Sequence, residues 1–202
     1  MKHKVITIGC EYGAGGPEIG KRIAQALGIE FYDRDLVDKV VEQIGVDRDL
    51  VKKADAGSNV LYSFETQYGP RYANLTNRVI YNQFEVIQKF AEKSSCVIIG
   101  RSADYILKDS KDIKLLRAFI YAPDEIRIQN IMKSHSLSES DAKILLLEKD
   151  KRYHKRHLAL TGSNRGDRHN RDILINSAFL DVEGTAEYLE ELIQKKYGSG
   201  EE

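Results

Sequence analysis

The chain has few cysteines, 2 among 202 residues, and neither has the CxxC or Cys/His spacing of a metal site. Cys10 follows one apolar run, and Cys96 begins another. At about 3.3 Å per residue, neighbouring parallel strands would hold the two thiols on the order of 13 Å apart, which excludes a disulfide. The fold therefore depends on its apolar core, and a chain of this length can bury one without covalent staples.

An excess of charge of either sign is also missing. Lys plus Arg and Asp plus Glu are 31 each, so no global field favours nucleic acid or an acidic membrane. No apolar run approaches the roughly 18 residues of a membrane span, and the initial MKHK leads directly into a strand pattern. We expect a cytoplasmic protein with neither nucleic acid nor membrane as a partner.

Short apolar runs alternate with amphipathic helical patterns along the chain. This alternation predicts an α/β fold, a doubly wound parallel sheet with helices on both faces. The expected strands are Val5–Gly9, Ile29–Tyr32, Cys96–Gly100, Leu115–Tyr121 and Ile173–Ile175. The expected helices are Glu18–Leu27, Arg34–Ile44, Arg71–Lys93, Asp124–Ser134, Ser138–His157 and Glu183–Tyr197.

The organisation indicates a single domain over residues 1–197. Residues 45–70 break the alternation and are interpreted as an insert at the carboxyl edge of the sheet. Residues 198–202, GSGEE, are expected to be a disordered tail.

The densest glycine segment joins the first strand to the first helix. Gly13, Gly15 and Gly16 allow positive φ and close approach to a ligand, and free N–H groups at the helix start favour an anion. Residues Gly13, Ala14, Gly15 and Gly16 are therefore predicted to cradle phosphate. The alternative is a glycine-rich turn that only lets helix and strand pack closely.

This loop departs from the phosphate-loop pattern GxxxxGK[ST]. With Cys10 in the first position, Gly16 and Pro17 stand where the pattern has its lysine and hydroxyl. A second register, Gly15 to Arg22, puts Lys21 in the lysine position but leaves Pro17 in mid-loop. We prefer the first register, because proline is tolerated in the first turn of a helix.

Cations recur later in the chain at helical spacing. Lys149, Arg152 and Arg156 are three and four residues apart, so they share a face of the predicted helix. The loop that follows adds three more arginines, which are Arg165, Arg168 and Arg171. The cluster resembles a lid that closes over phosphates, although a charged helical face is commonly just solvated.

Two further basic positions follow predicted strands, at the edge where open α/β sheets bind ligands. Arg101 could clamp an acceptor phosphate, or pair with Asp104 at the surface. Asp33 and Arg34 end the second strand run in the same way, and Asp33 could also cap the next helix.

Several segments together resemble the cytidylate-kinase-like branch of the P-loop nucleoside monophosphate kinases. They are FYDRDL, VIIGRSADYIL, FIYAPDEIRIQNIM and NRDILINS, and the resemblance spans about Lys4 to Leu192. The loop EYGAGGPEIG is similar to the form EYGSGGREIG typical of that branch, which also lacks the lysine. Pro17 is a departure of this chain.

The resemblance implies a P-loop fold with strand order 2-3-1-4-5, an acceptor-binding insert and a helical lid over about residues 138–171. It implies ATP at Gly13 to Gly16, an acceptor site at Asp33, Arg34 and Arg101, and catalytic lid cations at Arg152 and Arg156. Arg127 is a weaker candidate. The acidic residue that true cytidylate kinases carry before the glycine–arginine pair is Ile99 here, so Mg²⁺ is implied without identifiable ligands and no metal-binding residue is assigned.

We therefore expect a phosphotransferase that moves the ATP γ-phosphoryl group to a pyrimidine nucleoside monophosphate, CMP or dCMP. One alternative is a nucleotide sensor or interaction module that has lost catalysis, which the missing lysine and hydroxyl favour. The other is a kinase of another small acceptor. The sequence leaves the oligomeric state open, a homodimer included.

Overall fold

The computed structural model describes residues 2–43 and 70–198. Their strands form one all-parallel sheet in the order β2-β3-β1-β4-β5. The strands are β1 (His3–Cys10), β2 (Glu30–Tyr32), β3 (Cys96–Ile99), β4 (Ile113–Tyr121) and β5 (Ile173–Asn176). The order confirms the expected one. The predicted insert and tail lie outside the described residues, apart from their end positions Pro70 and Gly198.

The helices alternate with these strands, as the sequence pattern predicts. They are α1 (Gly16–Leu27), α2 (Arg34–Gln43), α5 (Pro70–Lys93), α6 (Ala103–Ile106), α7 (Asp124–His135), α8 (Glu139–Thr161) and α9 (Ser177–Tyr197), with a short 3-10 turn, η1 (Arg168–Asn170). Ser138 caps α8 by accepting a hydrogen bond from the Asp141 N–H, as expected for serine at that position. The short helix α6 was not expected from the sequence.

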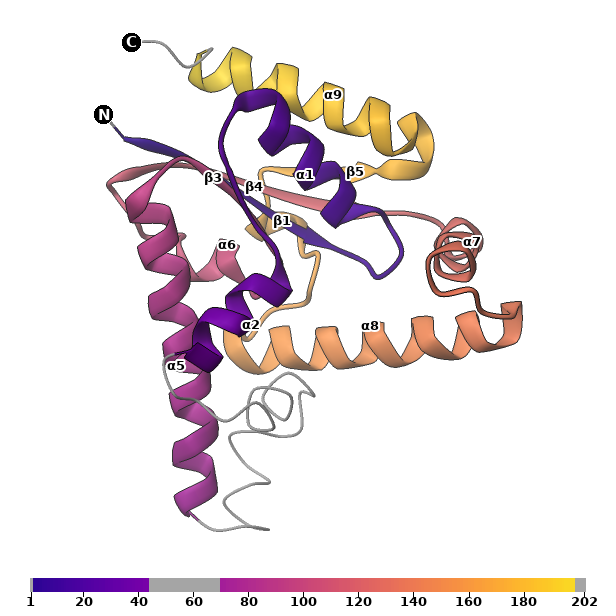
Figure 1. The fold of residues 1–202 in the computed structure, drawn as a ribbon, viewed down its shortest axis with the longest axis horizontal. Helices are drawn as coiled ribbons and strands as arrows, with labels where there is room; N and C mark the ends of the chain where they lie inside the picture. The colour runs from indigo at the N-terminus through magenta and orange to yellow at the C-terminus, as the bar shows by residue number, and fades with distance from the viewer. Residues whose placement is uncertain (1, 44–69, 199–202) are drawn as a thin grey trace.

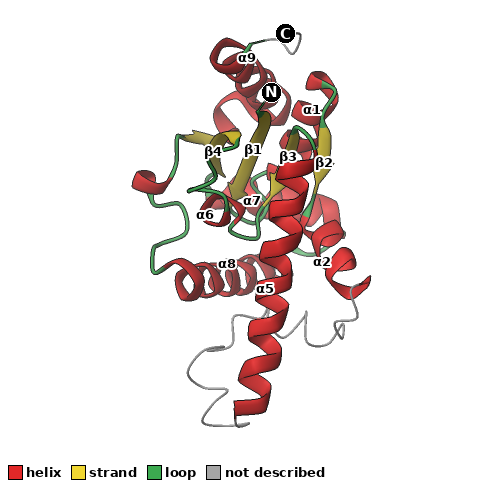
Figure 2. Cartoon of the chain, turned by 90° about the vertical axis from the view of Figure 1, so that its left-hand side faces the viewer, coloured by secondary structure: helices red, strands yellow, loops and turns green. Residues whose placement is uncertain are grey.

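Two apolar layers lie on opposite faces of the sheet. Helices α1 and α9 cover one face (Figure 1), where Ile8, Ile19 and Leu189 are buried together. Helices α5 and α6 cover the other face (Figure 2), where Val5, Ile87 and Leu107 are buried. The central strand β1 contributes side chains to both layers, so its apolar run is buried on both faces, as is usual in parallel sheets.

The last helix begins six residues earlier than predicted. Asn176 accepts a hydrogen bond from the Ala178 N–H and so caps a first turn that starts at Ser177. Asp181 interrupts this helix with φ 53° and ψ −172°, and the regular part follows it. The predicted start at Glu183 corresponds to the second, regular part.

The two cysteines occupy opposite ends of neighbouring strands, as predicted. Cys96 pairs with Val5 in the β1–β3 register, whereas Cys10 is the last residue of β1. Both thiols are free and buried. Among the described helices, none is long and apolar enough to span a membrane.

Candidate functional site at the carboxyl ends of the strands

The glycine loop joins β1 to α1 at the carboxyl end of the sheet. Gly13 and Gly15 adopt left-handed conformations with φ of 82° and 80°, which glycine reaches without steric cost. Gly13 and Ala14 have their carbonyl oxygens held by Asn130 and Ser177. Among the described residues, no partner accepts a hydrogen bond from the N–H groups of Gly13, Gly15 and Gly16. A loop with held carbonyls and available N–H groups at a helix start is suited to an anion.

Close packing also requires these glycines. A Cβ at Gly13 would lie 2.8 Å from the Arg127 carbonyl oxygen, and one at Gly15 would lie 2.8 Å from Val182 Cγ2. A Cβ at Gly16 would meet the Cys10 sulfur at 2.5 Å. The packing interpretation and the phosphate interpretation are therefore compatible at the same positions.

The structure distinguishes the two registers of the loop. Helix α1 begins at Gly16, which is the lysine position of the register that starts at Cys10, and Pro17 lies in its first turn. Lys21 lies inside α1 and is exposed. The second register is therefore wrong, because its lysine is in a helix rather than at the end of a loop.

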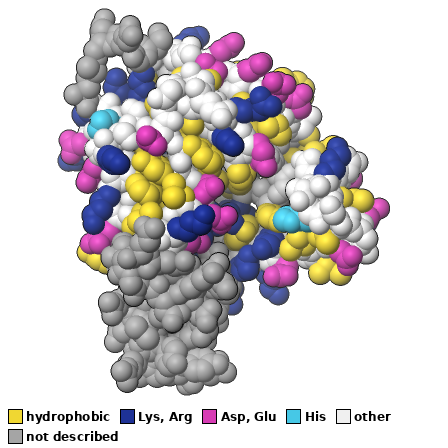
Figure 3. Space-filling view, in the orientation of Figure 1, with side chains coloured by type: hydrophobic (Ala, Val, Ile, Leu, Met, Phe, Trp, Pro, Cys, Tyr) yellow, Lys and Arg dark blue, Asp and Glu magenta, His cyan; other side chains and the backbone are white. Residues whose placement is uncertain are grey.

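A cavity of about 600 Å³ opens beside the loop. It lies among the loop, the start of α2 and one side of α7, and Figure 3 shows this opening beside the α7 end of the molecule. Its volume is in the range of small-molecule sites. Asp33 and Arg34 line it from the start of α2, and Tyr12, Asn130 and His135 line it from the loop and α7.

Asp33 caps a helix and also lies in the wall of this cavity. Its Oδ1 accepts a hydrogen bond of 2.8 Å from the Leu36 N–H, so it caps α2, and it also lines this cavity.

A second, smaller cavity of about 40 Å³ lies under the ends of β1, β3 and β4. Its wall contains five arginines, delivered by α2, the end of β3, α8 and the segment before β5. They are Arg34, Arg101, Arg156, Arg165 and Arg171. Cys10, Arg34 and Tyr153 line both cavities, so the two spaces meet at the beginning of the glycine loop.

Most of these arginines are already held by oxygen atoms. Arg101 is 4% exposed and pairs with Asp38 of α2, while Asp104 pairs with Arg171 instead. The alternative of a surface pair between Arg101 and Asp104 is therefore wrong, because both side chains are buried and pair with other residues. Arg156 donates a 2.6 Å hydrogen bond to Gln83 Oε1 of α5.

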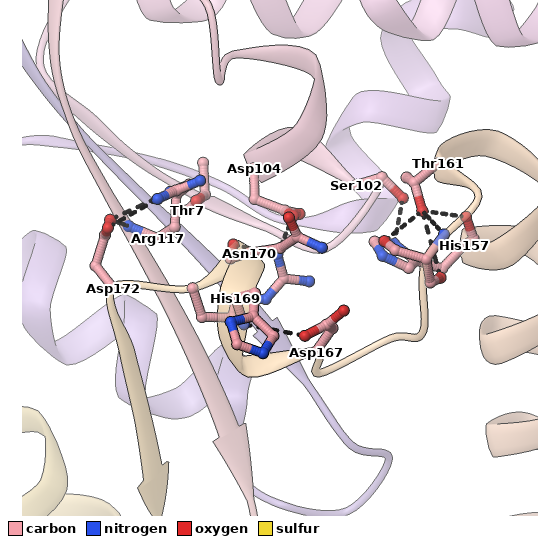
Figure 4. A network of polar contacts seen from close by, with 12 residues as sticks. Thr7, Ser102, Asp104, Arg117, His157, Thr161, Asp167, His169, Asn170 and Asp172 are labelled. Carbon is pink, nitrogen blue, oxygen red and sulfur yellow. Dashed lines mark hydrogen bonds and ion pairs between the residues drawn. The ribbon is translucent and has the colours of Figure 1, made fainter.

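Ser102 and His157 form a buried polar pair beside this cavity. Ser102 Oγ lies 3.0 Å from His157 Nδ1, and Asp104 lies nearby on α6, as Figure 4 shows. Burial is the main cause that lowers the pKa of His157 to about 4; Asp104 opposes this shift, and Arg171, Arg165 and Arg156 add to it. His157 is therefore neutral at pH 7, so the charge of the cavity comes from its arginines.

Arg127 of α7 links the glycine loop to α8. It is 4% exposed; its Nε donates to the Tyr12 carbonyl at 2.8 Å, and its other nitrogens pair with Asp124 and Asp150. The Tyr12 N–H donates in turn to Asp150 Oδ1 at 3.3 Å. Arg127 thus positions the loop, and it lines neither of the two cavities.

The structure separates the three cations expected on one face of α8. Arg156 lines the arginine cavity, whereas Lys149 and Arg152 line neither of the two cavities. Lys149 lies 5.8 Å from the Tyr12 ring centroid, and Arg152 lies 5.4 Å from that of Tyr153.

Sequence reasoning missed the neighbouring face of α8. Asp150, Tyr153 and His157 are three and four residues apart and face the loop and the cavity. This spacing could have revealed them.

The positions that supply Mg²⁺ ligands in the phosphate-loop pattern carry no such ligand in this chain. Pro17 offers no hydroxyl, Ile99 offers no carboxylate, and Asp104 is occupied by Arg171. No group of three side chains able to hold a metal occurs in the part of the chain that the structure describes. Mg²⁺ at a nucleotide needs only one or two carboxylates beside the phosphates, and those of Glu11, Glu18 and Asp33 line the cavity next to the loop.

Comparison with known proteins agrees with this geometry. The model of the cytidylate kinase-like family matches residues 5–178, and the chain belongs to that family. The cytidylate kinase of Pyrococcus horikoshii is 25% identical over 180 residues, which cover 89% of this chain and 83% of that protein. The cytidylate kinase of Methanococcus aeolicus is 23% identical over 192 residues, which cover 95% and 98%.

Solved structures give the same fold. An uncharacterized protein from Eubacterium ventriosum is similar with a TM-score of 0.73 at 25% identity, covering 95% of this chain and 99% of that one. A shikimate kinase from Acinetobacter baumannii, in complex with shikimate, has a TM-score of 0.50 at 15% identity, covering 96% and 95%. The five-stranded parallel sheet and its helices thus form a P-loop NTPase-like fold.

Proposed function

We propose that this protein transfers the γ-phosphoryl group of ATP to a pyrimidine nucleoside monophosphate, CMP or dCMP. The observation that carries this proposal is that a glycine loop with available N–H groups lies next to a cavity lined by five arginines. Phosphoryl transfer needs such an arrangement, because its catalysis is mainly positioning and stabilisation of charge by cations. Membership of the cytidylate kinase-like family supports a nucleotide as the acceptor.

Each part of the site has a role in this reaction. Gly13, Ala14, Gly15 and Gly16 hold the ATP phosphates, and Asp33, Arg34 and Arg101 hold the acceptor. An acceptor phosphate oxygen forms a bond to the γ-phosphorus while the bond from that phosphorus to the ADP oxygen breaks. Arg156, with Arg152 behind it on α8, stabilises the charge on the transferred group.

In this enzyme, residues 1–197 form one domain, and α8 with the segment to Arg171 is its lid over the phosphates. Free, buried thiols and the absence of a charge excess are consistent with a cytoplasmic enzyme acting on small nucleotides.

A panel of nucleoside monophosphates with ATP and Mg²⁺ tests the proposed acceptor. CMP or dCMP should give more diphosphate product than AMP, GMP or UMP. A preference for AMP or GMP would reject the pyrimidine assignment and keep the kinase, whereas a preference for UMP would reject only CMP and dCMP as the acceptors.

The second candidate function is a nucleotide sensor without catalysis. The absent lysine, hydroxyl and acidic residue favour it. A sensor binds ATP, which raises its melting temperature, yet forms no diphosphate with any acceptor. A kinase of another small acceptor would instead release ADP only when that acceptor is present.

A further inference from the structure

The glycine loop of this protein has no room for a lysine at the position where other phosphate loops carry one. In other phosphate loops, a lysine at the start of the helix reaches the β- and γ-phosphates. That position here is Gly16, where a Cβ would lie 2.5 Å from the Cys10 sulfur and 2.6 Å from the Cys10 Cβ. Cys10 thus fills the space that a side chain at position 16 would need, and the charge has to come from another element.

Arg165 places a guanidinium at this loop from the far end of the chain. One of its terminal nitrogens donates to the carbonyl oxygen of Cys10, the last residue of β1, and the other lies 3.5 Å from Asp150 Oδ1. The side chain is 14% exposed. The guanidinium lies 5.1 Å from the Tyr153 ring centroid and 5.9 Å from that of Phe119. It lines the arginine cavity together with Cys10.

The backbone fixes Arg165 in this place. The next residue, Gly166, has φ 89° and packs against Phe119. A Cβ at Gly166 would lie 3.0 Å from the Phe119 ring. The Asp167 N–H donates to the Asn164 carbonyl and closes the turn at 3.1 Å. The position of the guanidinium is thus set by β4 as well as by the loop.

Other cations near the loop are directed elsewhere. Lys21 is exposed on α1, and Arg127 is held by Tyr12, Asp124 and Asp150. The Arg34 guanidinium lies over Tyr153 and reaches toward Gly100, where a Cβ would lie 3.6 Å from it. Gly100 follows β3, on the proposed acceptor side.

We propose that Arg165 supplies the cation of the phosphate loop, binding the β- and γ-phosphate oxygens of ATP. This inference rests on the proposed function. A guanidinium has five N–H donors in a planar fork, so it can keep the Cys10 carbonyl and still bind a phosphate. Burial lowers the pKa of Arg165, because the cation has lost hydration. The negative charge of a bound phosphate compensates for this lost hydration.

Arg165→Gln removes the charge of the guanidinium. The glutamine side chain ends two bonds short of the terminal nitrogens, so it also loses the contacts to the Cys10 carbonyl and Asp150, and the melting temperature without nucleotide is measured beside the affinity to show whether the fold is kept. We expect ATP affinity, measured by calorimetry with a non-hydrolysable analogue, to fall about 10- to 100-fold, as for the loss of one charge-assisted contact. Lys155→Gln removes an exposed cation from α8 and should change the affinity less than about twofold.

Moving the cation back into the loop is the second test. In the Arg165→Gln protein, Cys10→Gly opens the space and Gly16→Lys adds the lysine. We expect this triple variant to regain most of the lost ATP affinity, whereas Arg165→Gln with Cys10→Gly alone does not.

Each outcome decides the inference. Wild-type affinity in folded Arg165→Gln protein would overturn it whether or not the triple variant folds, because that measurement stands alone. Loss without recovery in a folded triple variant would make Arg165 a structural residue. Failure of the unmodified protein to bind any nucleotide would instead reject the proposed function itself.

Discussion

Gly15 has to be glycine for two physical reasons that act together. Its φ of 80° strains any other residue, and an added Cβ would lie 2.8 Å from Val182 Cγ2. Gly28 shares the positive φ, at 63°, but has open space around it. Comparing substitutions at Gly15 and Gly28 therefore separates the effect of backbone strain from the effect of side-chain crowding.

We predict that Gly15→Ala lowers the free energy of unfolding by more than Gly28→Ala does. The second variant should cost only the left-handed strain, about 1–2 kcal/mol. Gly15→Ala should also weaken ATP binding at least about 10-fold, because the loop must move to relieve the contact, whereas Gly28→Ala leaves binding unchanged. Urea unfolding and calorimetry measure the two effects, and equal values for both variants would contradict the prediction.

Arg156 is the α8 cation that the structure places in the cavity. We predict that Arg156→Ala lowers kcat by at least about 10²-fold with a modest loss of ATP affinity, as for removal of an interaction used mainly in the transition state. Arg152→Ala should be milder, because that side chain lines neither cavity. Lys21→Ala is the control, with an expected change below about threefold.

Steady-state rates of diphosphate formation test this ranking, and thermal melts show that each variant is folded. An inactive Lys21→Ala protein beside active Arg156→Ala and Arg152→Ala proteins would mean that the phosphate-binding residues are wrongly assigned.

One buried cation, Arg127 of α7, contacts both the glycine loop and α8. Arg127 bonds the Tyr12 carbonyl, Asp124 and Asp150, so its removal leaves Asp150 partly buried without its strongest partner. We predict that Arg127→Met lowers the free energy of unfolding by about 3 kcal/mol, the usual cost of breaking a buried pair from one side.

The exposed pair Arg22–Glu183 provides a matched comparison, with side chains 52% and 65% exposed. Arg22→Met should cost less than about 0.5 kcal/mol, because water and salt screen an exposed pair. Both values come from denaturant unfolding, and a similar cost for the two variants would show that Arg127 does not join these elements.

The folded molecule responds to acid through a histidine that it keeps neutral. His157 has its pKa lowered to about 4, whereas unfolded histidine titrates near 6.5. Between these values, the unfolded chain binds a proton that the folded chain does not. Stability therefore falls as the pH drops from about 6.5 to 4, and the His157 contribution is constant below that window.

We predict that His157→Gln flattens this part of the stability curve, by at most about 3 kcal/mol between pH 7 and 4. The glutamine retains a group that can bond Ser102 but does not titrate. Chemical unfolding of both proteins at several pH values measures the difference. Parallel curves for the two proteins would show that His157 does not titrate in this range.

The sequence by itself determined the parallel sheet, its helices and the glycine loop between β1 and α1. Burial on both faces of the sheet restricts a strand such as Cys96–Ile99 to apolar residues, so the strand can be recognised from its own sequence. Positive φ likewise favours glycine in the loop, at Gly13 and Gly15. The separation of the two cysteines also followed, since strand length alone fixes it.

Only the tertiary structure decided which charges meet. Arg165 and Cys10 are 155 positions apart, and Arg101 joins Asp38 rather than the nearby Asp104. Helical spacing grouped Lys149 with Arg156, but the rotation of α8 against α7 and the sheet leaves only Arg156 of that face in the cavity. Such choices depend on how elements pack, because a buried cation needs a specific oxygen partner and no local pattern identifies it.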